Sequence, residues 1–139
     1  MLSRSILITG GCGFIGTSMI YSLLNKSSDI CIRVLDNLVT GTPEDLAGVS
    51  AFTKCPAEEC LDKTGVVLIE GDIRGQETVK RCAEGVDCIV HLAANTGVGP
   101  SVENPRLDME CNVTGTLNML EAARLNGVKK FIFASSGAP

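Results

Sequence analysis

A run of apolar residues near the start of the chain, "SILIT" (5–9), passes directly into "GGCGFIG" (10–16), which holds four glycines in seven positions. Glycine loses more conformational freedom on folding than any other residue, so such a cluster needs a structural or functional reason. Between a buried strand and a helix, glycines allow a tight turn and a close approach of the backbone to phosphate groups at the helix N-terminus. We therefore expect a phosphate site here, in which a side chain at Gly10 or Gly13 would fill the space that the phosphate needs.

Four further apolar runs follow, at 30–36, 66–72, 87–94 and 130–136. They are nearly continuous rather than alternating, which is typical of strands buried on both faces of a parallel sheet. The spacing of apolar residues predicts helices over 14–25, 76–83 and 105–126, the last capped by Asn104, and a short helix near 44–47 within an otherwise irregular segment at 37–64. This alternation predicts an α/β fold in one domain over 1–139, a doubly wound parallel sheet of five strands in the order 3-2-1-4-5.

Composition argues against several classes of partner. The net charge is −4 and the lysines and arginines are scattered, so no basic face for nucleic acid is expected. No stretch approaches the roughly 18 consecutive apolar residues of a membrane helix. The apolar run at the N-terminus is broken by glycines after five residues, which is short for a signal peptide. We expect a cytoplasmic protein with no nucleic-acid or membrane partner.

Seven cysteines are present, with no C-x-x-C motif and a single histidine, so no common zinc site can be assembled and no metal is expected. Cys31, Cys88 and Cys111 lie in apolar segments and are expected to be small buried hydrophobic residues. The segment "CPAEEC" (55–60) leaves two interpretations open. The favoured one is a plain surface loop with reduced thiols, and the other is a redox or metal-binding pair.

The glycine spacing matches a dinucleotide-binding fingerprint. Gly11-x-Gly13-x-x-Gly16 fits it, and Asp36 ends the second apolar run 20 residues after Gly16, where an acid can bind a ribose 2′-hydroxyl. The loop lacks the lysine of a nucleoside-triphosphate loop. An acid at this place favours NAD over NADP, because it repels a 2′-phosphate. The alternative is a tight strand-to-helix turn that binds no ligand, with Asp36 as a turn former.

Seven segments in order resemble one protein family: "TGGCGFIG" (9–16), "LDNLVTG" (35–41), "EGDIR" (70–74), "HLAA" (91–94), "SVENP" (101–105), "NVTGTLNMLEAAR" (112–124) and "KKFIFASS" (129–136). They are similar to the N-terminal part of extended short-chain dehydrogenases/reductases of the NAD-dependent epimerase/dehydratase family. The resemblance implies a Rossmann-type domain and a nucleotide-sugar substrate. The segment at 42–64 has no counterpart in this comparison.

The resemblance also implies a role for each matching position. Main-chain N–H groups of Phe14 and Ile15 would bind the pyrophosphate, in a cofactor-binding loop whose Gly10, Gly13 and Gly16 allow the tight turn and the close approach. The loop after the second strand would surround the adenosine ribose with Asp36, Asn37, Leu38, Thr40 and Gly41. Asp72 and Ile73 would hold the adenine, with the Asp72 carboxylate accepting from its amino group. The nicotinamide end would lie against Leu92, Ala93, Ala94 and Ser135. The side chain of Ser136 would hydrogen-bond the reacting sugar hydroxyl.

Simpler interpretations stand beside these roles. Asp72 is also a common turn residue, Ala93 and Ala94 also suit tight packing, and serine often ends a strand. The single histidine, His91, is expected to be a packed side chain rather than a catalyst. Asn112 matches a helix motif of the family in which the asparagine is expected to be structural.

The chain departs from the family pattern in one respect. A Tyr-x-x-x-Lys motif is expected after the fifth strand, but the only tyrosine is Tyr21, in the first predicted helix. We therefore expect the NAD-binding part of a longer nucleotide-sugar epimerase or dehydratase, inactive alone, with a homodimer contact along the 105–126 helix. Three alternatives remain: another reductase of the extended family acting on hydroxysteroids or flavonoids, a non-catalytic NAD-binding scaffold or sensor, and a small standalone nucleotide-binding module.

Overall fold

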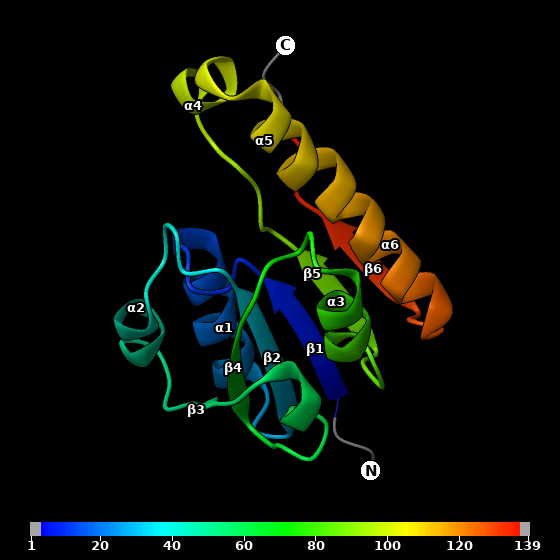
Figure 1. Ribbon diagram of the computed structural model, residues 1–139. Helices are drawn as coiled ribbons and strands as arrows, with labels where there is room; N and C mark the ends of the chain where they lie inside the picture. Colours follow the sequence, from blue (N-terminus) through cyan, green and yellow to red (C-terminus); the bar gives the residue numbers. More distant parts are fainter. Residues whose placement is uncertain (1–3, 137–139) are drawn as a thin grey trace.

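The computed structural model describes residues 4–136, in which six parallel strands form one sheet with helices on both faces (Figure 1). The strands are β1 (Arg4–Thr9), β2 (Ile30–Asp36), β3 (Thr53–Lys54), β4 (Val66–Glu70), β5 (Cys88–His91) and β6 (Lys130–Phe133). Their order is β3-β4-β2-β1-β5-β6. The α/β class and the order of the five predicted strands are confirmed.

The predicted strand count is wrong by one edge strand. β3 has only two residues, both exposed, and it pairs with Val67 and Leu68 of β4. Such a strand is defined by its main-chain pairing alone, and no apolar run marks it in the sequence. The predicted strands at 66–72, 87–94 and 130–136 also end earlier than expected, at Glu70, His91 and Phe133. The residues that follow them form loops at the carboxyl edge of the sheet.

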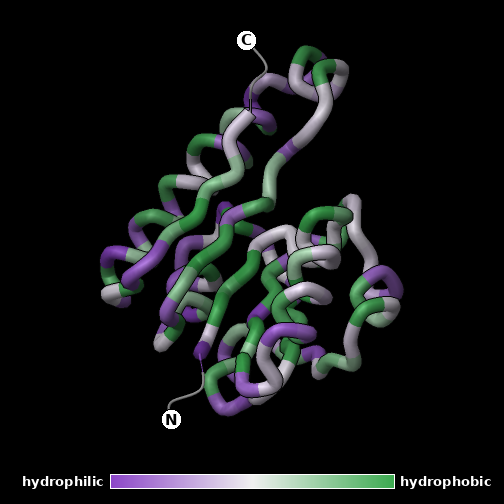
Figure 2. The backbone as a smooth tube through the Cα atoms, turned by 180° about the vertical axis from the view of Figure 1, so that it is seen from behind, coloured by the Kyte–Doolittle hydropathy of each residue, from purple (hydrophilic) through white to green (hydrophobic). Residues whose placement is uncertain are grey.

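The helices separate into two layers because alternate strand residues face opposite sides. On one face, α1 (Phe14–Lys26) and α2 (Pro43–Ala47) pack on a core that includes Ile8, Ile32, Val34, Leu68 and Val90. On the other face, α3 (Gln76–Cys82) and α6 (Gly115–Leu125) pack on a core that includes Leu7, Leu35, Val67, Ile69 and Ile89. Figure 2 shows the hydrophobic residues concentrated along the central strands.

The predicted helix at 105–126 is present as one run with a wider turn inside it. α5 (Pro105–Met109) passes through a π-helical turn (Glu110–Thr114) into α6. Asn104 caps α5 as expected, because its side chain accepts from the main-chain N–H of Leu107 at 3.1 Å. A further helix, α4 (Val98–Glu103), was not expected, and with α5 it extends past the carboxyl edge of the sheet (Figure 1). Within residues 4–136, every helix is too short or too polar to cross a bilayer.

Two expectations about cysteines are wrong. Cys31, Cys88 and Cys111 are only half-buried, whereas they were expected in the core. Cys55 and Cys60 are buried, so "CPAEEC" is not a plain surface loop. A 3-10 helix (Ala57–Glu59) turns both thiols toward the sheet, a tertiary effect that local sequence does not encode.

Candidate functional site

The glycine loop joins β1 to α1 at the carboxyl edge of the sheet. Gly10 has a φ of +68°, and its N–H donates to the main-chain oxygen of Leu35 at 2.9 Å. A Cβ atom on Gly10 would lie 2.9 Å from the main-chain nitrogen of Ala93, which follows β5. The loop therefore needs glycine here because the protein's own backbone approaches it. The expectation that a side chain at Gly10 would fill a phosphate's space stays a prediction beside this contact.

The neighbouring glycines serve close packing of the first helix. A Cβ on Gly11 would lie 2.7 Å from Cγ1 of Val34, and one on Gly16 would lie 2.5 Å from Cα of Gly11. At Gly13 the nearest atom is the main-chain oxygen of Gly10, at 3.3 Å. Gly13 is thus the glycine of the loop whose Cβ position is least obstructed by protein atoms, and its side-chain position stays available to a ligand.

The N-terminus of α1 presents donors with no side-chain cap. Gly13 is the capping residue, and it has no side chain that could accept from the first-turn N–H groups. Phe14 and Ile15, the first two residues of the helix, are 88% and 60% exposed. A helix N-terminus carries partial positive charge and N–H groups without helical acceptors. The arrangement suits an anion.

Asp36, at the end of β2, is tied to this loop. One carboxylate oxygen accepts from the N–H of Cys12 and the other from the N–H of Leu38, each at 2.9 Å. Leu38 has a φ of +59°, the one positive value among the non-glycine residues from 4 to 136. Each carboxylate oxygen can accept more than one hydrogen bond, so Asp36 retains acceptor capacity. The bonds fix an acid beside the glycine loop.

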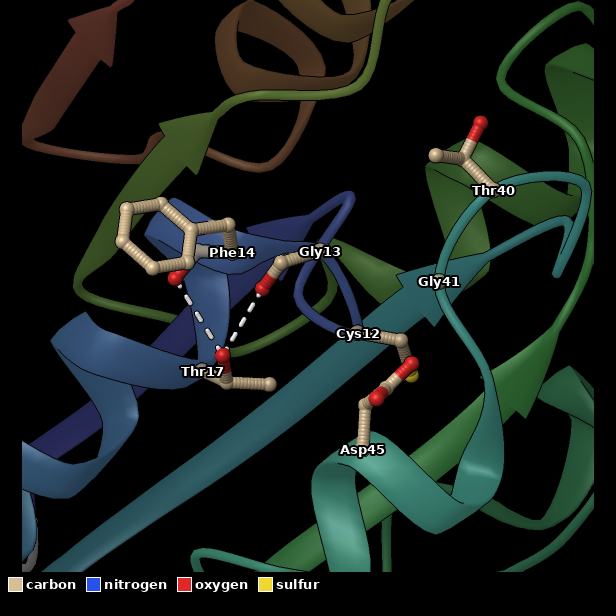
Figure 3. Close-up of a pocket in the computed structure, with 7 residues that line it drawn as sticks. All are labelled: Cys12, Gly13, Phe14, Thr17, Thr40, Gly41 and Asp45. Atoms are coloured by element: carbon tan, nitrogen blue, oxygen red, sulfur yellow. Dashed lines mark hydrogen bonds between the residues drawn. The ribbon is translucent and has the colours of Figure 1, made fainter.

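A cavity of about 300 Å³ lies between the start of α1 and the loop after β2 (Figure 3). Its lining residues are Cys12, Gly13, Phe14, Thr17, Thr40, Gly41 and Asp45. The Thr17 hydroxyl faces the helix and donates to the main-chain oxygen of Gly13 at 2.9 Å. Asp45 reaches the cavity from α2, where its side chain accepts from the N–H of Thr42 at 2.9 Å.

The charge around this cavity is negative. Burial, with the carboxylates of Asp36 and Asp45, raises the pKa of the Cys12 thiol to about 12. Cys12 therefore stays a neutral thiol at neutral pH. In the view of Figure 3 its sulfur lies behind the Asp45 carboxylate, which lines the same cavity. With the carboxylate of Asp45 in its lining, this cavity suits a neutral hydroxyl better than a phosphate.

A second cavity of about 490 Å³ lies where β5 and β6 end. The residues after these strands line it together with the π-helical turn and α6: His91, Leu92, Ala93, Ala94, Asn95, Thr96, Gly97, Asn112, Thr116, Phe133, Ala134, Ser135 and Ser136. Asn112 accepts from the N–H of Asn95 at 2.8 Å and donates to the Asn95 main-chain oxygen at 3.0 Å. Asn112 thus has the structural role expected for it, since it holds the loop after β5.

His91 is packed, as expected. Its side chain is 2% exposed, and its ring centroid lies 6.2 Å from that of Phe131 and 6.1 Å from that of Phe133. Burial lowers the pKa of His91 to about 4, so the ring is neutral at neutral pH. Its Nε2 lies 3.1 Å from the hydroxyl oxygen of Thr116, which donates in turn to the Asn112 main-chain oxygen at 2.7 Å.

Asp72, after β4, has a partner that the sequence did not indicate. Arg74 donates to it from Nε at 3.0 and 3.1 Å, from Nη2 at 2.7 Å and from its main-chain N–H at 2.8 Å. This guanidinium lowers the pKa of Asp72, and the carboxylate raises that of Arg74. The neighbouring Ile73 packs against Gly115 of α6, where a Cβ would lie 2.5 Å from Cδ1 of Ile73.

The predicted site residues line two cavities or lie outside both of them. Gly13, Phe14, Thr40 and Gly41 line the first cavity. Leu92, Ala93, Ala94, Ser135 and Ser136 line the second. The others stand outside both linings: Gly10, Ile15, Gly16, Asp36, Asn37, Leu38, Asp72 and Ile73. Sequence reasoning missed Cys12, Thr17 and Asp45 in the first cavity, although Cys12 lies within the glycine motif itself.

Comparison with known proteins gives a family match over nearly the whole chain. The sequence model of the NAD dependent epimerase/dehydratase family matches residues 6–139. UDP-glucose 4-epimerase 3 of Oryza sativa subsp. japonica is 34% identical over 134 residues, which cover 95% of this chain and 34% of that protein. The dTDP-glucose 4,6-dehydratase of Mycobacterium tuberculosis is 35% identical over 125 residues, which cover 89% of this chain and 34% of that protein. The chain thus spans about a third of the length of these curated relatives.

A solved structure has the same arrangement. The crystal structure of Thermus thermophilus UDP-glucose 4-epimerase in complex with NAD is 38% identical and superimposes with a TM-score of 0.76. The match covers 96% of this chain and 38% of that chain.

Proposed function

The chain belongs to the NAD dependent epimerase/dehydratase family, and from that premise we propose that it is the NAD-binding part of a nucleotide-sugar epimerase or dehydratase. The observation that carries the proposal is the junction of β1, β2 and α1. There the Asp36 carboxylate is bonded to the N–H of Cys12 inside the glycine loop, next to the uncapped start of α1. An acid and a set of main-chain donors side by side match the two ends of an adenosine diphosphate, its ribose and its phosphates.

Main-chain groups do most of the binding in this proposal. The N–H groups of Phe14 and Ile15 donate to the pyrophosphate, and the missing side chain of Gly13 gives it access. Gly10 and Gly16 keep the loop tight against the loop after β5 and against the helix. The helix dipole adds roughly 0.3–1 kcal/mol per charge at an exposed site, and direct N–H hydrogen bonds add more.

Asp36 selects the cofactor in this proposal. Its carboxylate accepts from the ribose 2′-hydroxyl, while Asn37, Leu38, Thr40 and Gly41 surround the sugar. A 2′-phosphate would meet the carboxylates of both Asp36 and Asp45, and like charges at this range repel. NAD is therefore the proposed cofactor of this chain as it is of the family.

The remaining predicted residues extend the site along the carboxyl edge. Asp72 and Ile73 bind the adenine, with the Asp72 carboxylate held in place by Arg74. Leu92, Ala93, Ala94 and Ser135 lie against the nicotinamide end in the second cavity. When bound, NAD supplies a nicotinamide ring that takes a hydride from a sugar carbon and returns it. The Ser136 hydroxyl orients the reacting sugar hydroxyl beside that ring.

The solved relatives support a nucleotide-sugar as the substrate. One is a Thermotoga maritima UDP-glucose 4-epimerase crystallised with UDP-glucose, 32% identical, with a TM-score of 0.76. Catalysis also needs a general base, and Tyr21 does not serve, since it lies on α1 with 56% of its side chain exposed and Asn25 four residues on. We assign this chain cofactor binding and substrate orientation only, and expect no turnover from it alone. The cytoplasmic location expected from the sequence stays a prediction.

Calorimetric titration of the chain with NAD⁺, NADP⁺ and UDP-glucose tests the proposal. We expect saturable binding of NAD⁺, at least tenfold weaker binding of NADP⁺, and little binding of UDP-glucose alone. Tighter binding of NADP⁺ than of NAD⁺ would overturn the role of Asp36. Absence of binding by either dinucleotide, with the chain folded by circular dichroism, would favour the alternative of a strand-to-helix turn without a ligand.

A further inference from the structure

Three polar side chains join the loop after β5 to the helical run that lies beside it. Asn95 lies in this loop, Asp108 lies on α5, and Asn112 lies in the π-helical turn. One carboxylate oxygen of Asp108, Oδ1, accepts from the side-chain amides of Asn95, at 3.0 Å, and of Asn112, at 3.2 Å. Asp108 is thus the common acceptor of the group, and the proposed NAD site does not use it.

The carboxylate of Asp108 sets the orientation of the Asn112 amide. An ionised carboxylate only accepts hydrogen bonds, so the NH₂ group of Asn112 must face it. In this orientation the amide oxygen of Asn112 accepts from the main-chain N–H of Asn95 at 2.8 Å, and its NH₂ group also donates to the main-chain oxygen of Asn95 at 3.0 Å. If the amide were turned over, its oxygen would face the carboxylate and its NH₂ group would face the N–H of Asn95. Asp108 therefore selects the orientation in which Asn112 binds both main-chain groups of Asn95.

Two anchors fix the main chain on either side of Ala94. On one side the N–H of Ala93 donates to the hydroxyl oxygen of Thr9 at 3.1 Å, and on the other side Asn95 is bonded to Asn112. Ala94, between them, is exposed and lines the second cavity. A segment held at both ends loses little further conformational freedom when a ligand binds, and this favours binding. The two anchors thus set in advance the surface that Ala94 presents to the cavity.

Hydrogen bonds matter at this place because apolar packing is sparse. The loop runs from β5 to α4, past the carboxyl edge of the sheet (Figure 1). Neither α4 nor α5 has a buried residue. Segments with few buried apolar contacts open at low free energy. The bonds to Asp108 are therefore expected to supply much of what keeps the loop in one conformation.

We propose that Asp108 is a positioning residue for the nicotinamide end of the cofactor, a role that rests on the NAD site proposed above. It holds Asn112 in the orientation that binds Asn95, and it thereby holds Ala94 where the nicotinamide end would contact the loop. The sites proposed for the adenosine and the pyrophosphate lie on other elements, at the end of β2 and the start of α1. Loss of Asp108 should therefore weaken binding of the nicotinamide part and spare binding of the rest.

Hydrogen exchange of the ligand-free chain tests the anchoring without any cofactor. We expect the main-chain amide of Asn95 to be protected in the unmodified protein and to exchange about tenfold faster or more in Asp108→Ala, as followed by NMR of isotope-labelled protein. The amide of Ala93 is an internal control, because its acceptor is Thr9 and its rate should not change. An unprotected Asn95 amide in the unmodified protein, or equal rates in the two proteins, would overturn the proposal.

Two further variants separate the hydrogen bonds from the charge. Asp108→Asn keeps an acceptor oxygen and should keep most of the protection at Asn95, because an amide oxygen has two lone pairs. Glu103→Gln removes a carboxylate from the exposed end of α4 and should change nothing. Faster exchange in Glu103→Gln, or the same increase in Asp108→Asn as in Asp108→Ala, would overturn the hydrogen-bonded anchor. If Asp108→Ala does not fold, Asp108→Glu replaces it with the same expected increase, because it keeps the charge and moves the oxygens by one bond.

Calorimetric titration with NAD⁺ and with ADP-ribose, which lacks the nicotinamide, tests the consequence for binding. We expect the unmodified chain to bind NAD⁺ more tightly than ADP-ribose. In Asp108→Ala we expect the affinity for NAD⁺ to fall about threefold or more, and that for ADP-ribose to change by less than about twofold. Equal affinity of the unmodified chain for the two ligands, or equal weakening of both in the variant, would overturn the proposal. If the unmodified chain binds neither ligand, the NAD site itself is refuted, and the exchange rate at Asn95 still decides whether Asp108 holds the loop.

Discussion

The hydroxyl oxygen of Thr9 lies 2.7 Å from Nδ1 of His91, and the two side chains are buried between the strands β1 and β5. The same oxygen accepts from the main-chain N–H groups of Leu92, at 3.2 Å, and Ala93, at 3.1 Å. Its own hydrogen is therefore directed at Nδ1, which leaves the ring hydrogen on Nε2, facing Thr116. A neutral imidazole with one defined tautomer thus holds the start of the loop that lines the second cavity.

This relationship predicts an acid-sensitive fold. Burial lowers the pKa of His91 from 6.5 to about 4, so between these values the unfolded chain binds a proton that the folded chain does not. The stability contributed by the neutral ring is complete above pH 6.5 and is lost as the pH falls toward 4. We expect the free energy of unfolding to fall by up to about 3 kcal/mol over this window. Urea unfolding at steps from pH 7 to pH 4 measures it.

His91→Gln is the control for the pH dependence of the free energy of unfolding. A glutamine keeps a polar side chain but does not titrate, so the variant should be less stable at pH 7 and nearly independent of pH between 6.5 and 4.5. The pKa of Asp72 is lowered, and its carboxylate therefore contributes its pH dependence below this window. Equal slopes for the variant and the unmodified protein would show that His91 is not the titrating group.

The close approach of Gly10 to Ala93 predicts a large loss of stability on substitution. Gly10→Ala places a Cβ 2.9 Å from a main-chain nitrogen and forces an L-residue to a φ of +68°. We expect the free energy of unfolding to fall by about 2–5 kcal/mol, the sum of left-handed strain and overpacking. Chemical denaturation measured by circular dichroism gives the value.

Gly85→Ala separates the two causes. Gly85 has a φ of +72°, but nothing lies within 4 Å of its Cβ position. This variant should lose only about 1–2 kcal/mol, from backbone strain alone. If both variants lose the same free energy, the contact with Ala93 has no energetic weight.

The fold was predictable where burial leaves a continuous signal. β2 and β4 are buried over most of their length and β1 over its last three residues, and all three appear as apolar runs. The helical spacing of apolar residues predicted α1 nearly to the residue. β3 and α4 carry no such signal, because the residues of β3 are exposed and α4 has no buried residue. Their conformations depend on pairing and on neighbours distant in the sequence.

The site was predictable only in its main-chain part. A glycine-rich turn is visible in sequence because the backbone itself requires glycine there, as at Gly10 and Gly16. Asp45 and Thr17 enter the first cavity from ordinary helical positions, and nothing in their local sequence marks them. The burial of Cys60 is likewise a consequence of packing. The ion pair of Asp72 with Arg74 is local and partly exposed, and it depends on the side-chain conformation of Arg74.

An exposed apolar stripe on α5, the π-helical turn and α6 predicts self-association. Met109, Val113, Leu117 and Leu120 are spaced three or four residues apart and are 44%, 62%, 57% and 46% exposed. Such spacing places them on one face, and a contiguous exposed apolar face favours a partner. We expect a dimer whose dissociation constant rises at least tenfold in Leu117→Glu, measured by sedimentation velocity over a range of concentrations.

Tyr21→Glu is the matched control for that surface. Tyr21 is 56% exposed, close to the value for Leu117, but it lies on α1, which covers the opposite face of the sheet. The control should dimerise like the unmodified protein. A monomer at every concentration, or an equal effect of both substitutions, would contradict the predicted contact.

The two hydrogen bonds of Asp36 predict how cofactor choice changes when its charge is removed. Asp36→Asn retains one acceptor oxygen but places an amide where the N–H of Cys12 or of Leu38 now donates. We expect NAD⁺ to bind about 10–100-fold more weakly, because a charged hydrogen bond contributes about 1.5–3 kcal/mol. The affinity for NADP⁺ should fall much less, because the repulsion between the Asp36 carboxylate and the 2′-phosphate also disappears. Calorimetric titration with both dinucleotides measures the ratio of the two dissociation constants, with thermal unfolding as a check on folding.

Asp62→Asn is the control: it removes the same charge just before β4, at the amino edge of the sheet, and should leave this ratio unchanged. If the ratio moves equally in both variants, only the net charge matters, and Asp36 does not choose the cofactor.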